Sequence, residues 1–228
     1  MLTDRPGVSD SRHPYLRPRD AATLIILRDQ REVLLGKRSS NHVFMPQRYV
    51  FPGGRVDRGD ARVPCPINLR TDVMDRLTDS TSPARARALA MAAVRETFEE
   101  TGLVLGVPHG THIRSRSPHW APFFDLGVVP ALDRLDYFAR AITPPNRVRR
   151  FDARFFLVDA EHLSGELTGN GELEDLQWVD LARVKELPLA SITALVLQVL
   201  AQRLRGQDPE QESTALFRSL RGSELIEH

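Results

Sequence analysis

Three glutamates within one short segment have a spacing that suits metal chemistry. Glu96, Glu99 and Glu100 stand at positions i, i+3 and i+4 in the stretch Arg95-Glu-Thr-Phe-Glu-Glu-Thr-Gly102. If this stretch is helical, all three carboxylates project from one face. Like charges at this spacing repel, and the end of a helix favours cations. A hard divalent cation such as Mg²⁺ reverses this penalty, because it binds carboxylate oxygens. The alternative is an acidic face exposed to solvent, with Arg95 as its counter-charge.

The helix that must position these glutamates has clear ends in the sequence. Ser82-Pro83 is typical of a helix start, with serine as the N-cap and proline at the first helical position. Gly102 stands where a glycine commonly ends a helix. The sequence therefore predicts a helix from Pro83 to Thr101 that ends just after the glutamates.

A glycine turn and two aspartates precede this helix. Phe51-Pro-Gly-Gly54 follows a short predicted strand, 49–51, and Asp57 and Asp60 come next. A loop and a helix that bring backbone amides, an arginine and several carboxylates together suit a metal-bound pyrophosphate.

Together these residues resemble the Nudix box, whose pattern is G-x5-E-x7-R-E-U-x-E-E-x-G-U. The match runs from Gly54 to Asp60 and then from Arg95 to Leu103. Asp60 stands where the family has Glu, Thr97 fills a usually aliphatic position, and residues 61–94 take the place of the family's seven. A box interrupted in this way resembles the coenzyme A diphosphatase branch of the family. Further similarity to that branch lies in the segments 134–140, 142–144 and 150–156, and the whole resemblance covers residues 19–205.

The resemblance implies a fold and a reaction. The fold is an α/β/α sandwich with a mixed β-sheet between helices. The reaction is hydrolysis of a nucleoside diphosphate linked to another group, with coenzyme A or its esters as one substrate class. Mg²⁺ or Mn²⁺ would be held by the acidic residues of the box, which are Asp60, Glu96, Glu99 and Glu100. Arg95 would orient these glutamates, and Gly53 and Gly54 would shape the substrate loop.

A general base and a substrate contact are also needed. Many Nudix enzymes take an additional ligand or base from outside the box, and Glu172 and Glu174 are candidates because a strand at 172–179 places both on one face. The alternative for this pair is the polar outer face of a strand. A box glutamate, Glu99 or Glu100, could serve as the base instead. Arg38 belongs to a stretch that partly resembles a coenzyme A-associated motif, so it is a candidate phosphate contact.

The insertion, about 61–82, carries a second amphipathic pattern. Leu69, Val73, Met74 and Leu77 share one helical face, which predicts a short helix near 68–77. Because the insertion joins the glycine turn to the acidic helix, we expect this helix to line one wall of the substrate cleft. Three histidines, His109, His112 and His119, fall in a predicted loop, and no cysteine or second pair completes a zinc site with them.

Composition limits the other classes of function. The 228 residues include 31 Lys plus Arg and 30 Asp plus Glu, a net charge of +1 that argues against a nucleic-acid-coating protein. The single cysteine, Cys65, excludes a disulfide framework. The absence of a long apolar run indicates no membrane segment, and we expect a cytoplasmic enzyme.

The domain organisation follows from the same patterns. We expect a flexible tail at 1–18, one Nudix domain at 19–206 and a polar tail at 207–228. The resemblance implies a small nucleotide as ligand and a homodimer as one form of assembly. Two competing functions stay open at this point. One is a Nudix-fold module that senses a nucleotide without cleaving it, and the other is a hydrolase of ADP-ribose or dinucleoside polyphosphates.

Overall fold

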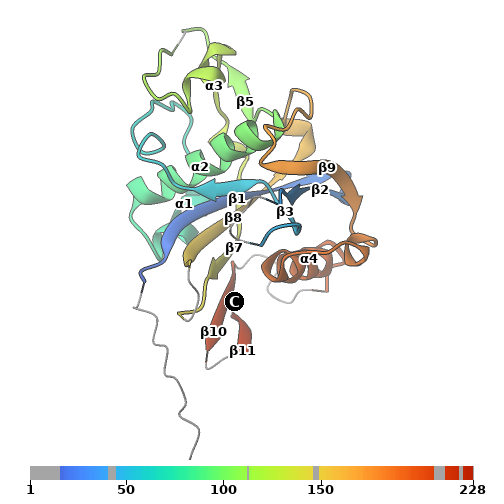
Figure 1. Ribbon diagram of the computed structural model, residues 1–228. Helices are drawn as coiled ribbons and strands as arrows, with labels where there is room; N and C mark the ends of the chain where they lie inside the picture. The colour runs from blue at the N-terminus through green and yellow to red at the C-terminus, as the bar shows by residue number, and fades with distance from the viewer. Residues whose placement is uncertain are drawn as a thin grey trace, which may run out of the picture.

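The structure is built around one large mixed sheet. The computed structural model describes residues 16–40, 45–111, 113–145, 149–207, 214–220 and 223–227. The sheet strands are β1 (Arg19–Arg28), β2 (Glu32–Arg38), β3 (Tyr49–Val50), β4 (Gly53–Arg55), β7 (Asp136–Ile142), β8 (Phe151–Asp159), β9 (Leu173–Asp180), β10 (Ala215–Leu220) and β11 (Ser223–Glu227). Their order is β11-β10-β7-β8-β1-β2-β3, with β4 also paired to β1 and β9 to β2 (Figure 1). β1 runs parallel to β8 and antiparallel to β2 and β4, so the sheet is mixed as expected.

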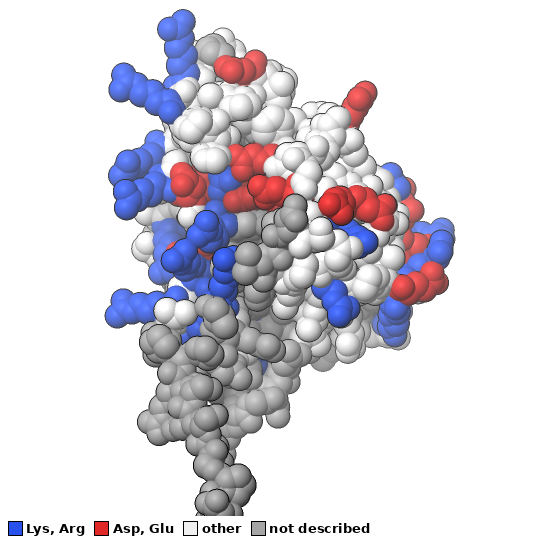
Figure 2. All heavy atoms as spheres, viewed as in Figure 1, with Lys and Arg blue, Asp and Glu red and all other residues white. Residues whose placement is uncertain are grey.

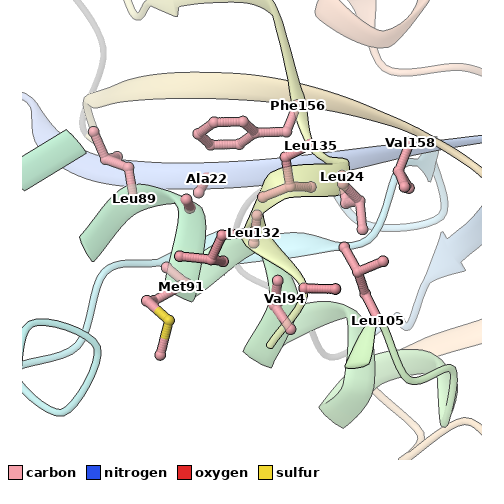
Figure 3. Close-up of a cluster of buried hydrophobic side chains, with 14 of the residues drawn as sticks. Ala22, Leu24, Leu89, Met91, Val94, Leu105, Leu132, Leu135, Phe156 and Val158 are labelled. Carbon is pink, nitrogen blue, oxygen red and sulfur yellow. The ribbon is translucent and has the colours of Figure 1, made fainter. Parts of the chain in front are cut away.

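Helices cover both faces of this sheet. α1 (Thr71–Thr78) and α2 (Pro83–Thr101) lie on one face, and α4 (Ser191–Leu204) lies on the other (Figure 1). The central strand β1 shows why, because its side chains alternate between two apolar clusters. Leu24 belongs to the cluster with α2, part of which is shown in Figure 3, and Ile25 belongs to the cluster with α4. The predicted α/β/α sandwich is confirmed.

Smaller elements complete the chain. They are a two-stranded sheet of β5 (Gly106–Pro108) and β6 (Val128–Pro130), the short helix α3 (Ala121–Asp125), and the 3₁₀ turns η1 (Leu132–Arg134), η2 (Ala160–His162) and η3 (Val184–Glu186). Within the described residues, no helix is long and apolar enough to cross a membrane.

The predicted ends of α2 are confirmed. The Ser82 hydroxyl accepts a hydrogen bond from the backbone N–H of Arg85 at 3.4 Å, and Pro83 is the first helical residue. At the other end, Gly102 has a φ of 77°, a conformation that glycine adopts without strain, and its N–H bonds to the Phe98 carbonyl at 2.9 Å. These caps fix the length of the helix, so that the three glutamates occupy its last turns.

The short helix predicted in the insertion forms, as α1, and its apolar face packs on the body of the protein. α1 packs against α2 and β7, with Val73 and Leu77 fully buried. Together with the first turn of α2 it lines a surface cavity of about 430 Å³ that includes Arg87. Arg87 and Glu99 are twelve residues apart on one helix, about 18 Å at the rise of an α-helix. α1 is therefore part of the hydrophobic core, and the expectation that it lines one wall of the substrate cleft stays a prediction.

The two ends of the chain also differ from the predicted tails. Residues 1–15 of the N-terminal segment lie outside the described residues, and the Leu16 carbonyl accepts a hydrogen bond from Arg150 at 2.6 Å. In the segment expected to be a polar tail, β10 pairs in parallel with β7 and antiparallel with β11. Ala215 and Phe217 of β10 are buried in the cluster that includes α4. Part of 207–228 therefore belongs to the sheet.

Candidate active site

The glycine turn and the acidic end of α2 meet directly. The N–H of Gly53 donates to the Oε2 atom of Glu100 at 2.7 Å. A side chain at position 54 would have its Cβ 2.4 Å from the carboxylate carbon of Glu96, so any residue larger than glycine would displace that carboxylate. Acidic side chains gather near the middle of the face seen in Figure 2, where α2 and β4 lie in Figure 1, and basic side chains lie beside them. The structure thus brings Gly53, Gly54, Glu96 and Glu100 together.

Arg95 joins the two halves of the interrupted motif. Its Nε donates to Asp60 Oδ1 at 2.8 Å and its Nη2 donates to Asp60 Oδ2 at 3.0 Å. Its Nη1 donates to Glu96 Oε1 at 2.9 Å and to Glu99 Oε2 at 2.8 Å. Burial acts to lower the pKa of Arg95, but the bond to Asp60 and the charge of Glu96 outweigh it, so the pKa is raised. The guanidinium is therefore charged and orients two of the three glutamates.

Asp60 has a different role from the metal ligand expected from its type. Its side chain is completely buried, and its oxygens accept hydrogen bonds from Arg95, from the indole N–H of Trp120 at 2.9 Å and from the backbone N–H of Asp57 at 2.7 Å. Because its side chain has no exposed surface and both oxygens bind protein donors, Asp60 holds Arg95 in place. The shorter aspartate suits this contact because Arg95 reaches it directly.

Two residues of the loop before α3 complete the surroundings, and the sequence did not predict them. Trp120 is fully buried against Phe123 and Phe124 and contacts Asp60. His119 Nδ1 lies 3.0 Å from Glu99 Oε1. His109 makes no side-chain hydrogen bond or ion pair among the described residues, and His112 lies outside them. The contacts of His119 and Trp120 depend on how a loop folds back over α2, which no local spacing signals.

The candidates outside the box occupy different places. Arg38 and Glu172 both lie close enough to Glu100 for their charges to act on its pKa. The Glu172 carbonyl accepts from the Ser39 N–H at 3.3 Å, which ties the start of β9 to the end of β2. Glu174 is exposed on β9 opposite Lys37 and makes no side-chain hydrogen bond or ion pair among the described residues. Glu172 lies just before the first residue of β9, and the φ of 49° at Asp175 interrupts the strand alternation after Glu174.

Burial disfavours the negative charge of two of the three glutamates, Glu96 and Glu100. Burial raises the pKa of Glu100 well above its ordinary value, although the Gly53 N–H bond opposes the shift. Burial also raises the pKa of Glu96, against the lowering effect of Arg95. A set of buried carboxylates near one another fits a hard divalent cation, which binds oxygen and supplies the missing charge.

The carboxylates of Glu96, Glu99 and Glu100 are not arranged around one point as the ligands of a metal ion would be. Across the part of the chain that the structure describes, no three Asp, Glu, His or Cys side chains are gathered as a metal-binding group. The hydrogen bonds explain this, because Arg95 draws Glu96 and Glu99 toward its own Nη1 while Glu100 bonds to Gly53. The residue types and positions fit a cation, which would bind through the carboxylate lone pairs that these hydrogen bonds leave free.

Comparison with known proteins decides the family. The model of the NUDIX domain matches residues 85–200, which is half of the chain and includes the acidic end of α2. The chain belongs to the Nudix hydrolase family. A solved Nudix hydrolase from Alicyclobacillus acidocaldarius is 30% identical, with a TM-score of 0.60 over 81% of this chain and 91% of that one. The resemblance drawn from the box residues is thereby confirmed.

Curated relatives of this Nudix hydrolase include members of the coenzyme A branch. The chain is 28% identical over 174 residues to nudix hydrolase 7 of Caenorhabditis elegans, covering 71% of this chain and 51% of that protein. It is 34% identical over 99 residues to the acyl-coenzyme A diphosphatase NUDT19 of Xenopus laevis, covering 34% of this chain and 26% of that protein. The chain thus spans about half or less of the length of these relatives. Nudix hydrolases generally act with divalent metal ions, which agrees with the acidic face of α2.

Proposed function

We propose that this Nudix hydrolase cleaves the pyrophosphate of a nucleoside diphosphate linked to another group, with coenzyme A or its esters as substrate. The observation that carries the proposal is the meeting of Glu96, Glu99 and Glu100 with the Gly53-Gly54 turn, held together by Arg95. The names of the relatives, which include acyl-coenzyme A diphosphatases, support the choice of substrate.

In this proposal each residue has a defined task. Glu96, Glu99 and Glu100 hold Mg²⁺ or Mn²⁺, which when bound offsets the charge of the pyrophosphate and acidifies an attacking water. Arg95 orients Glu96 and Glu99 and is itself held by Asp60. The Gly53-Gly54 turn keeps the backbone close to the site, so that a phosphate can approach without meeting a side chain.

Residues outside the box supply the candidate general base and a candidate contact to the phosphate. Glu172 is exposed and lies within range of the charge of Glu100, so it is the better placed of the two candidate bases outside the box. Glu174 makes no such contact and stays a candidate only through its neighbouring position on β9. Arg38 opposes the negative charge of Glu100, which suits an arginine that binds a phosphate oxygen beside the carboxylates.

The turn after β4 adds positive charge for an anionic substrate. Arg55, Arg58 and Arg62 are exposed, and within the described part of the chain their side chains make no hydrogen bond or ion pair. The turn that carries them is fixed to the site. The Asp60 N–H donates to the Asp57 carbonyl, the Asp57 N–H donates to the Asp60 carboxylate, and Asp60 binds Arg95. Unpaired arginines beside a metal site favour the approach of a polyphosphate ester.

A substrate panel tests the proposal. The purified protein would be incubated with coenzyme A, an acyl-coenzyme A, ADP-ribose and a dinucleoside polyphosphate, and the products identified by mass spectrometry. We expect cleavage of coenzyme A within its pyrophosphate, abolished by EDTA and restored by Mg²⁺ or Mn²⁺. Preferential cleavage of ADP-ribose or a dinucleoside polyphosphate would move the substrate assignment, and undiminished hydrolysis in excess EDTA would contradict the role of the glutamates.

A further inference from the structure

The loop before α3 contacts the site at three points. Trp120 donates its indole N–H to Asp60, and His119 contacts Glu99 through Nδ1. The Ser117 hydroxyl oxygen lies 2.9 Å from where a side chain on Gly59 would begin, so the loop packs closely on the turn that carries Asp60. None of these contacts belongs to the Nudix box, and they bring an imidazole to the middle residue of the acidic face.

These contacts close a ring of hydrogen bonds around Arg95. The ring runs from Arg95 to Glu99, from Glu99 to His119, along the chain to Trp120, from Trp120 to Asp60 and back to Arg95. Within it Glu99 is held at both oxygens, by Arg95 at Oε2 and by His119 at Oε1. Nδ1 carries the hydrogen of the second bond, because an ionised carboxylate only accepts.

A glutamate held at both oxygens loses the rotamer freedom that a long side chain otherwise has. Each carboxylate oxygen has two lone pairs, so the bond from His119 leaves one on Oε1 for a cation. We propose that His119 is a positioning residue that aims the Glu99 carboxylate at the divalent cation. This inference rests on the proposed function, since it assumes that Glu99 is a metal ligand.

The position of His119 argues against a mainly structural role. Its side chain is 55% exposed, whereas the neighbouring Trp120 is fully buried and anchors the loop. Removal of the imidazole therefore exposes little apolar surface and leaves the anchor intact. The bond to Glu99 is the one side-chain hydrogen bond that His119 makes among the described residues.

The test measures binding of Mn²⁺ alone to the substrate-free protein by calorimetry. His119→Ala removes the donor, His119→Asn keeps an amide nitrogen where Nδ1 stands, and His119→Gln moves that nitrogen toward the position of Nε2. We expect His119→Ala and His119→Gln to weaken Mn²⁺ binding about tenfold or more, the effect usual for partners that orient a metal ligand. His119→Asn should restore most of the affinity, and all three variants should unfold at the same temperature as the wild type without metal.

A control and a kinetic readout separate the possible results. His109 lies in the same loop between β5 and α3, and its side chain makes no hydrogen bond among the described residues. The control variant His109→Ala should therefore bind Mn²⁺ like the wild type. For His119→Ala, the rate of hydrolysis should recover at high Mn²⁺ concentration while the concentration for half-maximal rate rises. Unchanged Mn²⁺ affinity in His119→Ala, or equal weakening in His119→Ala and His119→Asn, would overturn the inference and leave the proposed function standing. No Mn²⁺ binding by the wild type would overturn both.

Discussion

At the scale of the residue, the site depends on a few buried charged groups. Separating them would lower the free energy of unfolding, because each charge would lose its partner. Arg95 is buried and binds three carboxylates, and Asp60 is buried and binds Arg95 at both oxygens. Removing one partner of a buried ion pair typically costs about 3–5 kcal/mol, because the other charge is left unpaired. The protein thus holds two glutamates in place with a contact that also supports the fold.

The charge of Glu100 lowers the stability of the metal-free protein. The raised pKa of Glu100 therefore makes the free energy of unfolding depend on pH. Because the folded, metal-free protein holds this proton more tightly than the unfolded chain, the free energy of unfolding falls as the pH rises from about 4.5 through the raised pKa. Glu100→Gln stays neutral and keeps an oxygen for the Gly53 N–H. We expect the variant to be more stable than the wild type by roughly 0.5–2 kcal/mol at pH 8 in EDTA, with the difference shrinking toward pH 5.

Urea unfolding at both pH values measures this difference. Glu186→Gln is a matched control, because Glu186 is exposed and, among the described residues, pairs only with Arg183 on the surface. It should behave like the wild type at either pH. A Glu100→Gln difference that is absent, or that does not change with pH, would show that burial does not disfavour the Glu100 charge.

At the scale of the element, the contrast between α1 and α2 shows what local patterns can predict. The ends of α2 follow from Ser82, Pro83 and Gly102, whose effects act within one turn of the helix. For α1 the apolar spacing predicted a helix correctly, but an apolar face does not say which element it packs against. In the structure Arg76 ties α1 to β7, since it donates to the Tyr137 carbonyl at 2.8 Å and pairs with Asp136 on that strand.

The position of α1 changes the expected effect of altering the insertion. Leu77 is fully buried in the cluster between α2 and the sheet. We expect Leu77→Ala to lower the free energy of unfolding by about 2–5 kcal/mol and to leave the KM for substrate unchanged. Chemical denaturation and steady-state kinetics on the same preparation check both statements. If Leu77→Ala instead altered substrate preference and left stability unchanged, the result would support α1 as one wall of the substrate cleft.

At the scale of the whole molecule, the sheet extends further than its sequence indicates. β7 pairs with β10, about 75 residues further along the chain, and such parallel pairing has no local signal. The polar residues of 207–228 gave no indication that Ala215 and Phe217 are buried. The same limit applies to the site, where the box residues were predicted from spacing but His119 and Trp120 were not.

Phe217 provides the test of this extension. It is buried against the face of the sheet that α4 covers. We expect Phe217→Ala to cost about 3–5 kcal/mol of unfolding free energy, as for other buried phenylalanines, with hydrolysis per folded molecule unchanged because the site lies on the opposite face. Thermal unfolding measures the first effect and active-site-normalised rates measure the second. If Phe217→Ala were as stable as the wild type, β10 would not be part of the hydrophobic core.

Assembly is the remaining question at this scale. The homodimer that the family resemblance implies stays a prediction, which light scattering on the purified chain would check.

The most direct test of the central claim compares single-turnover hydrolysis of coenzyme A by wild-type protein, Glu99→Gln and Glu186→Gln at saturating Mg²⁺. Glu99→Gln keeps the shape of the side chain and removes the charge that would hold a cation, and it also leaves one acceptor where Arg95 and His119 now have two. We predict that Glu99→Gln lowers the rate by orders of magnitude with unchanged circular dichroism, while Glu186→Gln matches the wild type. Equal rates in all three proteins would contradict the account, because the acidic face of α2 would then take no part in the reaction.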